Sequence, residues 1–190
     1  MIGEDEWAEC LTASPAADGL TVYAVKFAPD GSRGALAACV RPADGSPYIE
    51  VIESMAMSCG VGWFADWLAP RWREAAQIVV DGAANSGTLV QMLRDRGVPQ
   101  KVIVAPKSAD VATACAMLSN AVTERSVTHI GQPALDRSAT GAQKRPIGSG
   151  GGWGFAAIGD SDPSLVEACA LALWGAMTTK RNPSRKLRIG

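Results

Sequence analysis

Three extended segments follow one another near the start of the chain, and tight turns separate them. The segments cover residues 20–28, 34–41 and 48–54. The first is rich in Val, Tyr and Phe, and the third alternates between apolar and polar residues. Pro-Asp-Gly-Ser at residues 29–32 and Pro-Ala-Asp-Gly at residues 42–45 supply turns, because Pro fixes φ and Gly accepts positive φ. Strands joined by such short turns pair in antiparallel fashion. The sequence therefore predicts a three-stranded antiparallel meander.

Helices and short strands alternate in the rest of the chain. The pattern predicts helices over residues 62–76, 86–96, 110–123, 133–142 and 164–178, and short strands over 77–80 and 101–105. Residues 126–130 are expected to be extended, 148–152 to form a glycine-rich loop, and 154–158 to be a strand or part of a hairpin. A meander followed by βα units is the layout of a ribonuclease H-like α/β fold. That fold has a mixed five-stranded sheet, made of an antiparallel meander plus parallel βα units, with helices on both faces.

The chain of 190 residues has the length of one domain, which we place at residues 20–178. A polar lead-in occupies residues 1–19, with a possible short helix over 4–11, and a basic tail occupies residues 179–190. No apolar run approaches the roughly 18 residues of a membrane span, and the acidic N-terminus is not a signal peptide. The five scattered cysteines form no CxxC pair, which favours free thiols in a reducing cytoplasm.

Charge and motifs exclude further classes of function. The 18 basic and 19 acidic residues give a net charge of -1, so the chain is not a bulk-basic nucleic-acid binder. One histidine excludes a mechanism that needs two, and no phosphate-binding GxxxxGK[ST] loop is present. The distribution of charge is uneven, however, since residues 121–190 hold nine bases against five acids. A local contact with nucleic acid is compatible with that excess.

Asp81 is the first candidate for chemistry. It ends the apolar run Ile-Val-Val and is followed by a glycine turn. Ligands of open α/β sheets bind beyond the carboxyl ends of the strands, so an acid at this place can face a binding crevice. The alternative is that Asp81 caps the turn or the helix that follows.

Asp162 and Glu167 form a second group of acids near the last predicted helix. Asp162 precedes Pro163 and Ser164, which is the pattern of a helix N-cap, and this local interpretation competes with a functional role. Glu167 is a lone carboxylate on an otherwise apolar helix, and we expect it to face solvent.

Residues 128–146 combine polar, basic and glycine residues with little apolar content. His129, Lys144 and Arg145 are the candidates there for contacts with the phosphate backbone of DNA. The alternative is a solvated surface segment, and the basic tail allows the same two interpretations.

Several motifs together resemble a known family. HIGQPALDRSATGAQKRPIG, GWGFA, DSDPSLVEACALALWG and the earlier VVDGAANSGTLVQML are similar to the C-terminal nuclease domain of phage terminase large subunits, especially those of actinobacterial phages and prophages. The similarity extends from about residue 7 to residue 175. It implies a ribonuclease H-like endonuclease that cuts concatemeric viral double-stranded DNA during genome packaging. It also implies two Mg²⁺ or Mn²⁺ ions held by clustered acids.

The resemblance also implies partners and a setting. In that family an ATPase motor domain precedes the nuclease, and other packaging subunits assemble with it in the cytoplasm of the bacterial host. The motor has no counterpart in this sequence, so we expect either an excised domain or a prophage remnant. No membrane partner is expected.

One position departs from the family pattern. Three metal-binding acids are expected, of which the second maps onto Asp81 and the third onto Asp162, but the first-strand position is occupied by Lys26. An ammonium group cannot ligate a hard cation, so we expect Lys26 to pair with Asp81 or Asp162 in place of a metal. Asp30 lies too far along the strand to substitute, and Glu50 and Glu53 on the third strand are the candidates to compensate.

Three hypotheses follow from this departure. The first is that the chain is a terminase-type, metal-dependent endonuclease whose activity Lys26 weakens or abolishes. Alternatively it is a non-catalytic DNA-binding or packaging module, or another ribonuclease H-like nuclease such as a resolvase.

Overall fold

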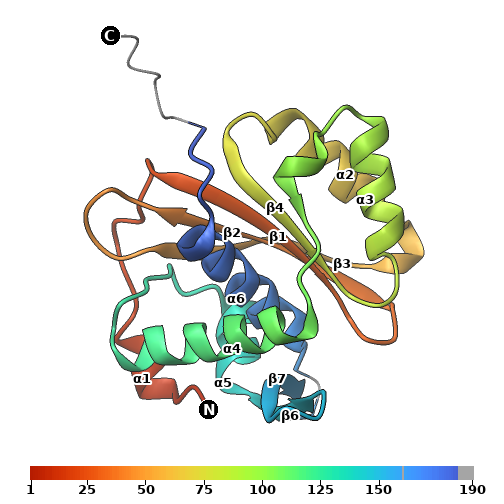
Figure 1. Ribbon diagram of the computed structural model, residues 1–190. Helices are drawn as coiled ribbons and strands as arrows, with labels where there is room; N and C mark the ends of the chain where they lie inside the picture. Colours follow the sequence, from red (N-terminus) through yellow and green to blue (C-terminus); the bar gives the residue numbers. More distant parts are fainter. Residues whose placement is uncertain (160, 184–190) are drawn as a thin grey trace, which may run out of the picture.

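A mixed five-stranded sheet in the order β3-β2-β1-β4-β5 forms the centre of the fold (Figure 1). In this computed structural model, which describes residues 1–159 and 161–183, the strands are β1 (Leu20–Phe27), β2 (Arg33–Arg41), β3 (Tyr48–Ala56), β4 (Ala75–Asp81) and β5 (Ile103–Val104). The pairs β1–β2 and β2–β3 are antiparallel, whereas β1–β4 and β4–β5 are parallel. The predicted meander and the ribonuclease H-like class of sheet are confirmed.

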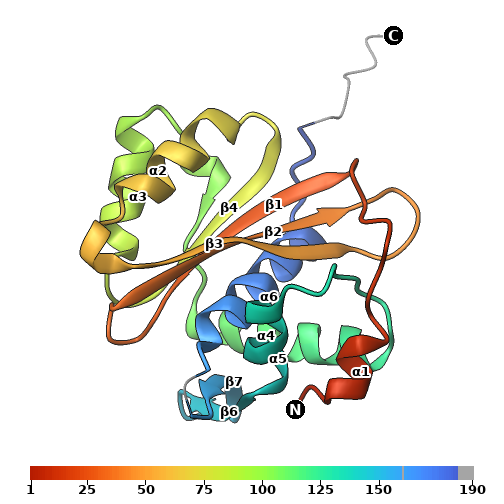
Figure 2. The same ribbon diagram turned by 180° about the vertical axis from the view of Figure 1, so that it is seen from behind.

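Helices cover both faces of this sheet. They are α1 (Glu4–Ala8), α2 (Gly62–Leu68), α3 (Ser86–Asp95), α4 (Ser108–Thr123), α5 (Pro133–Thr140) and α6 (Pro163–Thr178). Helices α2 and α3 lie on one face, and α6 crosses the other face with α4 and α5 beside it (Figures 1 and 2). The helix predicted over 62–76 ends at Leu68 and continues as one 3₁₀ turn (Ala69–Arg71), because Pro70 lacks the N–H that would extend an α-helix.

The sheet separates two apolar cores, and the side chains of each strand point alternately into one core and the other. Val22 and Ala24 of β1 pack under α4 and α6, whereas Val25 and Phe27 pack against α2 and α3. Because successive side chains of a strand point to opposite faces, one apolar strand serves both cores. Helix α6 is apolar on nearly all sides because it lies between the sheet and α4 and α5.

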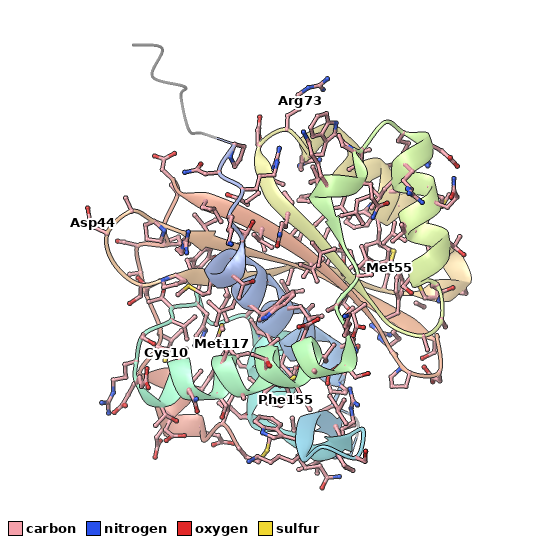
Figure 3. All side chains as sticks on the ribbon, viewed as in Figure 1. Cys10, Asp44, Met55, Arg73, Met117 and Phe155 are labelled. Atoms are coloured by element: carbon pink, nitrogen blue, oxygen red, sulfur yellow. The ribbon has the colours of Figure 1, made fainter. Side chains whose placement is uncertain are left out.

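A separate two-stranded sheet stands at the end of α6. It consists of β6 (Ala142–Ile147) and β7 (Gly152–Ala157), joined by the glycine-rich turn that the sequence predicts. Phe155 points from β7 into the core that α4 covers (Figure 3). The strand β6 was not predicted, since its sequence AQKRPI is polar and contains a proline.

The N-terminal lead-in packs against the domain. Ile2, Trp7 and Cys10 are buried in the core beneath α4 and α6, and the indole Nε1 of Trp7 donates to Asp136 Oδ1 at 2.8 Å. At the other end, the guanidinium of Arg181 donates to the carbonyl oxygens of Ala75 and Ala76. The rest of the predicted tail, residues 184–190, lies outside the described residues. Within the described part of the chain, no helix is both long and apolar enough to cross a bilayer.

Candidate functional site: a buried charge cluster

Lys26 and Asp81 are neighbours at the carboxyl ends of two parallel strands. The register of β1 and β4 places Lys26 directly beside Asp81. The Lys26 ammonium forms an ion pair with Asp81 Oδ2, and the side chains of the two residues are 7% and 17% exposed. Both strands end at this edge of the sheet, where open α/β sheets present their binding sites. The first-strand lysine and the fourth-strand acid therefore meet, as the sequence predicts.

Glu167 completes this arrangement from the opposite layer. Its Oε2 atom lies 3.0 Å from Lys26 Nζ, and its Oε1 atom lies 2.8 Å from Arg145 Nη2. The backbone N–H of Phe155 donates to the same Oε1 at 3.0 Å. The expectation that Glu167 faces solvent was wrong, because α6 presents this side chain to the sheet edge and to β7, where it is 2% exposed. Lys26, Asp81, Arg145 and Glu167 are called the charge cluster below.

Gly154 allows the β6–β7 hairpin to come this close to Glu167. A Cβ atom on Gly154 would lie 2.8 Å from Glu167 Oε1 and 2.9 Å from Ile147 Cδ1. It would also lie 3.1 Å from Arg145 Cζ. A side chain at this position would therefore force Glu167, Ile147 or Arg145 to shift.

The charges of the cluster balance. Burial alone lowers the pKa of Lys26, but the negative charges of Glu167 and Asp81 and their hydrogen bonds outweigh burial and raise that pKa above its ordinary value. Lys26 is therefore a stable ammonium ion at neutral pH. Two carboxylates and two cations then give the cluster no net charge.

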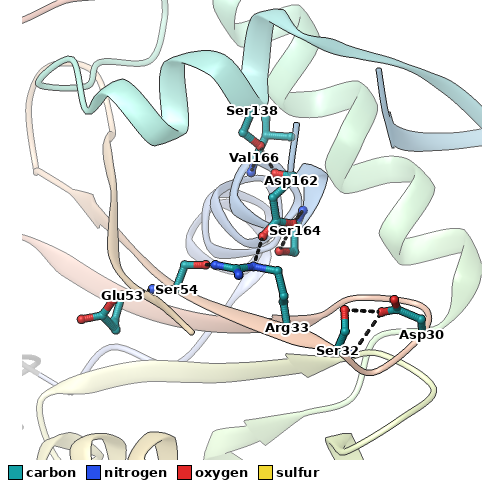
Figure 4. A network of polar contacts seen from close by, with 9 residues as sticks. All are labelled: Asp30, Ser32, Arg33, Glu53, Ser54, Ser138, Asp162, Ser164 and Val166. Carbon is teal, nitrogen blue, oxygen red and sulfur yellow. Dashed lines mark hydrogen bonds and ion pairs between the residues drawn. The ribbon is translucent and has the colours of Figure 1, made fainter. Parts of the chain in front are cut away.

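Asp162 does not join this cluster by any hydrogen bond or ion pair among the described residues. Its Oδ1 atom accepts from the backbone N–H of Ser164 at 3.0 Å, which caps α6. Its Oδ2 atom pairs with Arg33 Nε at 3.0 Å, and its carbonyl oxygen accepts from Ser138 at 2.6 Å (Figure 4). The capping interpretation thus describes the observed contacts, and Glu167 rather than Asp162 pairs with Lys26. Both acids line one cavity of about 790 Å³.

The proposed DNA contacts fall into different environments. His129 is 1% exposed and stacks on Trp7 with 3.9 Å between ring centroids, while its Nε2 lies 2.9 Å from the Trp7 carbonyl oxygen. Its side chain is therefore enclosed by the protein in this structure, and its contacts are internal. Lys144 is exposed on β6, with its Nζ 4.6 Å from the centre of the Trp153 ring. Arg145 belongs to the charge cluster, and its side chain is 32% exposed.

The acids considered as substitutes for the first ligand lie elsewhere. Asp30 accepts from the N–H and hydroxyl of Ser32 in the β1–β2 turn. Glu50 accepts from the Tyr48 hydroxyl at 2.7 Å, and Glu53 accepts from the N–H of Ser54 at 2.9 Å. Both glutamates are on β3, which is two strands away from β1.

The residues at the sheet edge do not fit the divalent ions that the resemblance implies. Across residues 1–159 and 161–183, no group of three His, Cys, Asp or Glu side chains could hold a metal ion. Asp81 and Glu167 already pair with Lys26, and a divalent cation between them would lie beside the ammonium group. Hard cations require oxygen ligands, which an ammonium does not provide.

The fold matches solved nuclease domains of viral terminases. The large terminase nuclease of thermophilic phage G20c superposes with a TM-score of 0.62 at 14% identity, covering 90% of this chain and 97% of that one. The human cytomegalovirus terminase nuclease domain gives 0.52 at 11%, covering 91% and 92%. Neither a protein-family model nor a curated protein sequence matches the chain.

A longer terminase also contains this fold, and the comparison shows how much of it the present chain covers. The HK97 bacteriophage large terminase superposes with a TM-score of 0.60 at 11% identity, covering 92% of this chain. The present chain spans 43% of that protein. The chain therefore has the fold of a terminase large-subunit nuclease domain. Solved structures of the G20c domain contain cobalt or magnesium, and crystals of the cytomegalovirus domain were soaked with manganese.

Proposed function

We propose that this chain is a terminase-type packaging domain that binds double-stranded DNA and does not cut it. One observation carries the proposal: the Lys26 ammonium lies between Asp81 and Glu167, where the nuclease interpretation requires a metal centre. The fold supports the packaging setting, and the charge cluster favours the non-catalytic hypothesis over the endonuclease hypothesis.

The chemistry of the cluster explains why hydrolysis is not expected. Metal-assisted cleavage of a phosphodiester needs ions that activate water and stabilise the leaving oxygen. Lys26 cannot replace them as a base, because its raised pKa keeps it protonated. Asp81 and Glu167 both form ion pairs with Lys26, and Glu167 also pairs with Arg145, so the ammonium group lies beside both acids that a metal centre would need. The cluster instead holds β1, β4, α6 and the hairpin together.

The proposed partner is duplex DNA, contacted through phosphate groups. Lys144 is exposed on the hairpin, and the bases outnumber the acids in residues 121–190 by nine to five. Contacts of this kind depend on salt and not on sequence. By analogy with terminases, an ATPase motor and other packaging subunits would be further partners, in a bacterial host cell infected by, or carrying, the phage.

Two assays on the unmodified chain test this function. The first is nicking of supercoiled plasmid with Mg²⁺ or Mn²⁺, for which we expect no product above the level of an Asp81→Asn variant. The second is binding to a fluorescent duplex, for which we expect affinity that falls steeply with salt and does not change with EDTA. Metal-dependent nicking that Asp81→Asn abolishes would support the endonuclease hypothesis instead. Cleavage of branched or RNA–DNA hybrid substrates would favour the resolvase-like alternative.

A further inference from the structure

Two cavities adjoin over the N-terminus of α6. The first, of about 660 Å³, lies between β3 and α5, and the second is the cavity of about 790 Å³ beside the charge cluster. Arg33, Ser161 and Asp162 line both cavities. Figure 4 shows the ion pair between Arg33 and Asp162 that the two cavities share. The two cavities together, from β3 to the hairpin, are called the α6 groove below.

Three arginines line the α6 groove, and each has N–H groups that form no hydrogen bond among the described residues. Arg137 is exposed on α5, and among the described residues no hydrogen bond or ion pair engages its guanidinium. Arg33 uses Nε for Asp162 and Nη2 for Ser54, with its side chain 48% exposed. Arg145 uses Nε for the Phe155 carbonyl and Nη2 for Glu167. Since a guanidinium carries five N–H donors, each arginine retains donors for a ligand.

The acids of the groove are engaged within the protein. Asp162 caps α6, and Glu167 accepts three contacts inside the charge cluster and from β7. Asp30 accepts from Ser32 through Oδ1, and Glu53 accepts from the N–H of Ser54 through Oε1. The two acids that pair with Arg33 and Arg145 are thus directed to internal donors, whereas these arginines retain further N–H groups. The groove consequently offers N–H donors to an anionic ligand at its arginines.

We propose that the α6 groove binds the phosphate backbone of one strand of duplex DNA, through Arg33, Arg137 and Arg145 and without a metal ion. The inference rests on the proposed function and adds the contact site to it. A planar guanidinium matches phosphate oxygens in bidentate geometry, which favours phosphate as the recognised group. Arg137 lines one cavity, Arg145 lines the other and Arg33 lines both, so the groove can offer a guanidinium to more than one phosphate of a strand. Contacts of this type position DNA without reading its sequence.

Arg137→Ala is the most direct test, because this side chain has no hydrogen-bond or ion-pair partner in the part of the chain that the structure describes. Arg94→Ala is the matched control, since Arg94 is exposed on α3, which covers the opposite face of the sheet. Binding to a fluorescent duplex is measured by anisotropy over a series of salt concentrations in EDTA. Arg33→Ala is a second groove variant, and its melting temperature shows whether loss of the Asp162 pair affects folding.

We expect Arg137→Ala to weaken binding about five- to tenfold at low salt. The slope of log affinity against log salt should fall by about one. Arg94→Ala should leave both quantities unchanged. If Arg137→Ala and Arg94→Ala behave alike while the unmodified chain binds DNA, the groove is not the contact site and the proposed function stands. If the unmodified chain binds no duplex at any salt concentration, the proposed function itself fails, and the groove proposal fails with it.

Discussion

The Nζ atom of Lys26 lies 3.0 Å from Oε2 of Glu167, and the two side chains are 7% and 3% exposed. This contact joins the first strand of the sheet to the last helix of the fold. Because Lys26 also pairs with Asp81, and Glu167 with Arg145, one buried ammonium connects β1, β4, α6 and the β6–β7 hairpin. The buried Lys26 ammonium thus lies at the carboxyl ends of β1 and β4, in a fold that terminase nuclease domains share.

Replacing Lys26 by methionine should destabilise the protein strongly. The change keeps the length of the side chain and removes its charge, so Asp81 loses its ion-pair partner and Glu167 keeps only Arg145 and the Phe155 N–H. Breaking a buried ion pair typically costs about 3–5 kcal/mol. We expect a loss of this order in the free energy of unfolding, measured with urea. Lys101→Met, at an exposed lysine, is the control. Equal stabilities of the two variants would show that the pairs contribute nothing.

Adding a methyl group at Gly154 should displace the hairpin from Glu167. The new Cβ would lie 2.8 Å from Glu167 Oε1, which forces the carboxylate or the strand to move. We expect Gly154→Ala to lower the free energy of unfolding by about 1–3 kcal/mol. Amide hydrogen exchange in β6 and β7 should also become faster. Gly150→Ala is the matched control, because a Cβ there meets no atom within 4 Å. Unchanged exchange in both variants would contradict the close approach.

Stability should fall in alkaline solution as buried thiols ionise in the unfolded state. Burial raises the pKa of the Cys39 thiol to about 12 from its ordinary value of 9.0. Above pH 9 the unfolded chain releases this proton while the folded chain keeps it, so ionisation favours unfolding. The free energy of unfolding should therefore fall by up to about 1.4 kcal/mol per pH unit between about pH 9 and the pKa of Cys39 in the folded protein.

Cys39→Ala isolates this effect from the other titrating groups. The stability difference between the unmodified chain and Cys39→Ala should shrink as pH rises above 9, in urea unfolding at several pH values. Cys59→Ala is the control, since Cys59 is an exposed cysteine. A difference that stays constant with pH would refute the assignment of a buried, protonated thiol at this position.

Lys26→Asp should convert the internal ion pair into a site that responds to divalent cations. A third carboxylate beside Asp81 and Glu167 would leave an excess of negative charge, so we expect low stability without metal and a rise in melting temperature with Mn²⁺. Lys26→Asn, which adds no charge, should show no rise. The effect should persist with Asp162→Asn added and disappear with Glu167→Gln added. The reverse pattern would make Asp162 the functional acid, as the resemblance implies.

Strand pattern and turn chemistry were sufficient to predict the sheet. The pairing of Lys26 with Asp81 or Asp162 was predicted from the resemblance, and the parallel register of β1 and β4 explains why Asp81 is the partner. Helix 62–76 was predicted too long because apolar periodicity continued past Pro70, where the backbone cannot continue as an α-helix.

The position of Glu167 depended on information that local sequence does not contain. Helix α6 is apolar on almost every side, so its pattern does not reveal which face a single carboxylate occupies. One signal for a buried Glu167 was available in the sequence: Lys26 lies inside an apolar strand, and a buried ammonium requires an acidic partner. The contact between Gly154 and Glu167 could be recognised only once the fold was known. His129 was predicted to contact DNA because its neighbours in the sequence are polar. Those neighbours do not reveal that Trp7, far away in the sequence, stacks on its ring.

We infer that Lys26 takes the place of a metal ion, and calorimetric titration of the unmodified chain with Mn²⁺ is the sharpest test. No saturable heat of binding is expected at neutral pH, because Asp81 and Glu167 are already neutralised by Lys26 and Arg145. Saturable binding of Mn²⁺ that Asp81→Asn abolishes would contradict it.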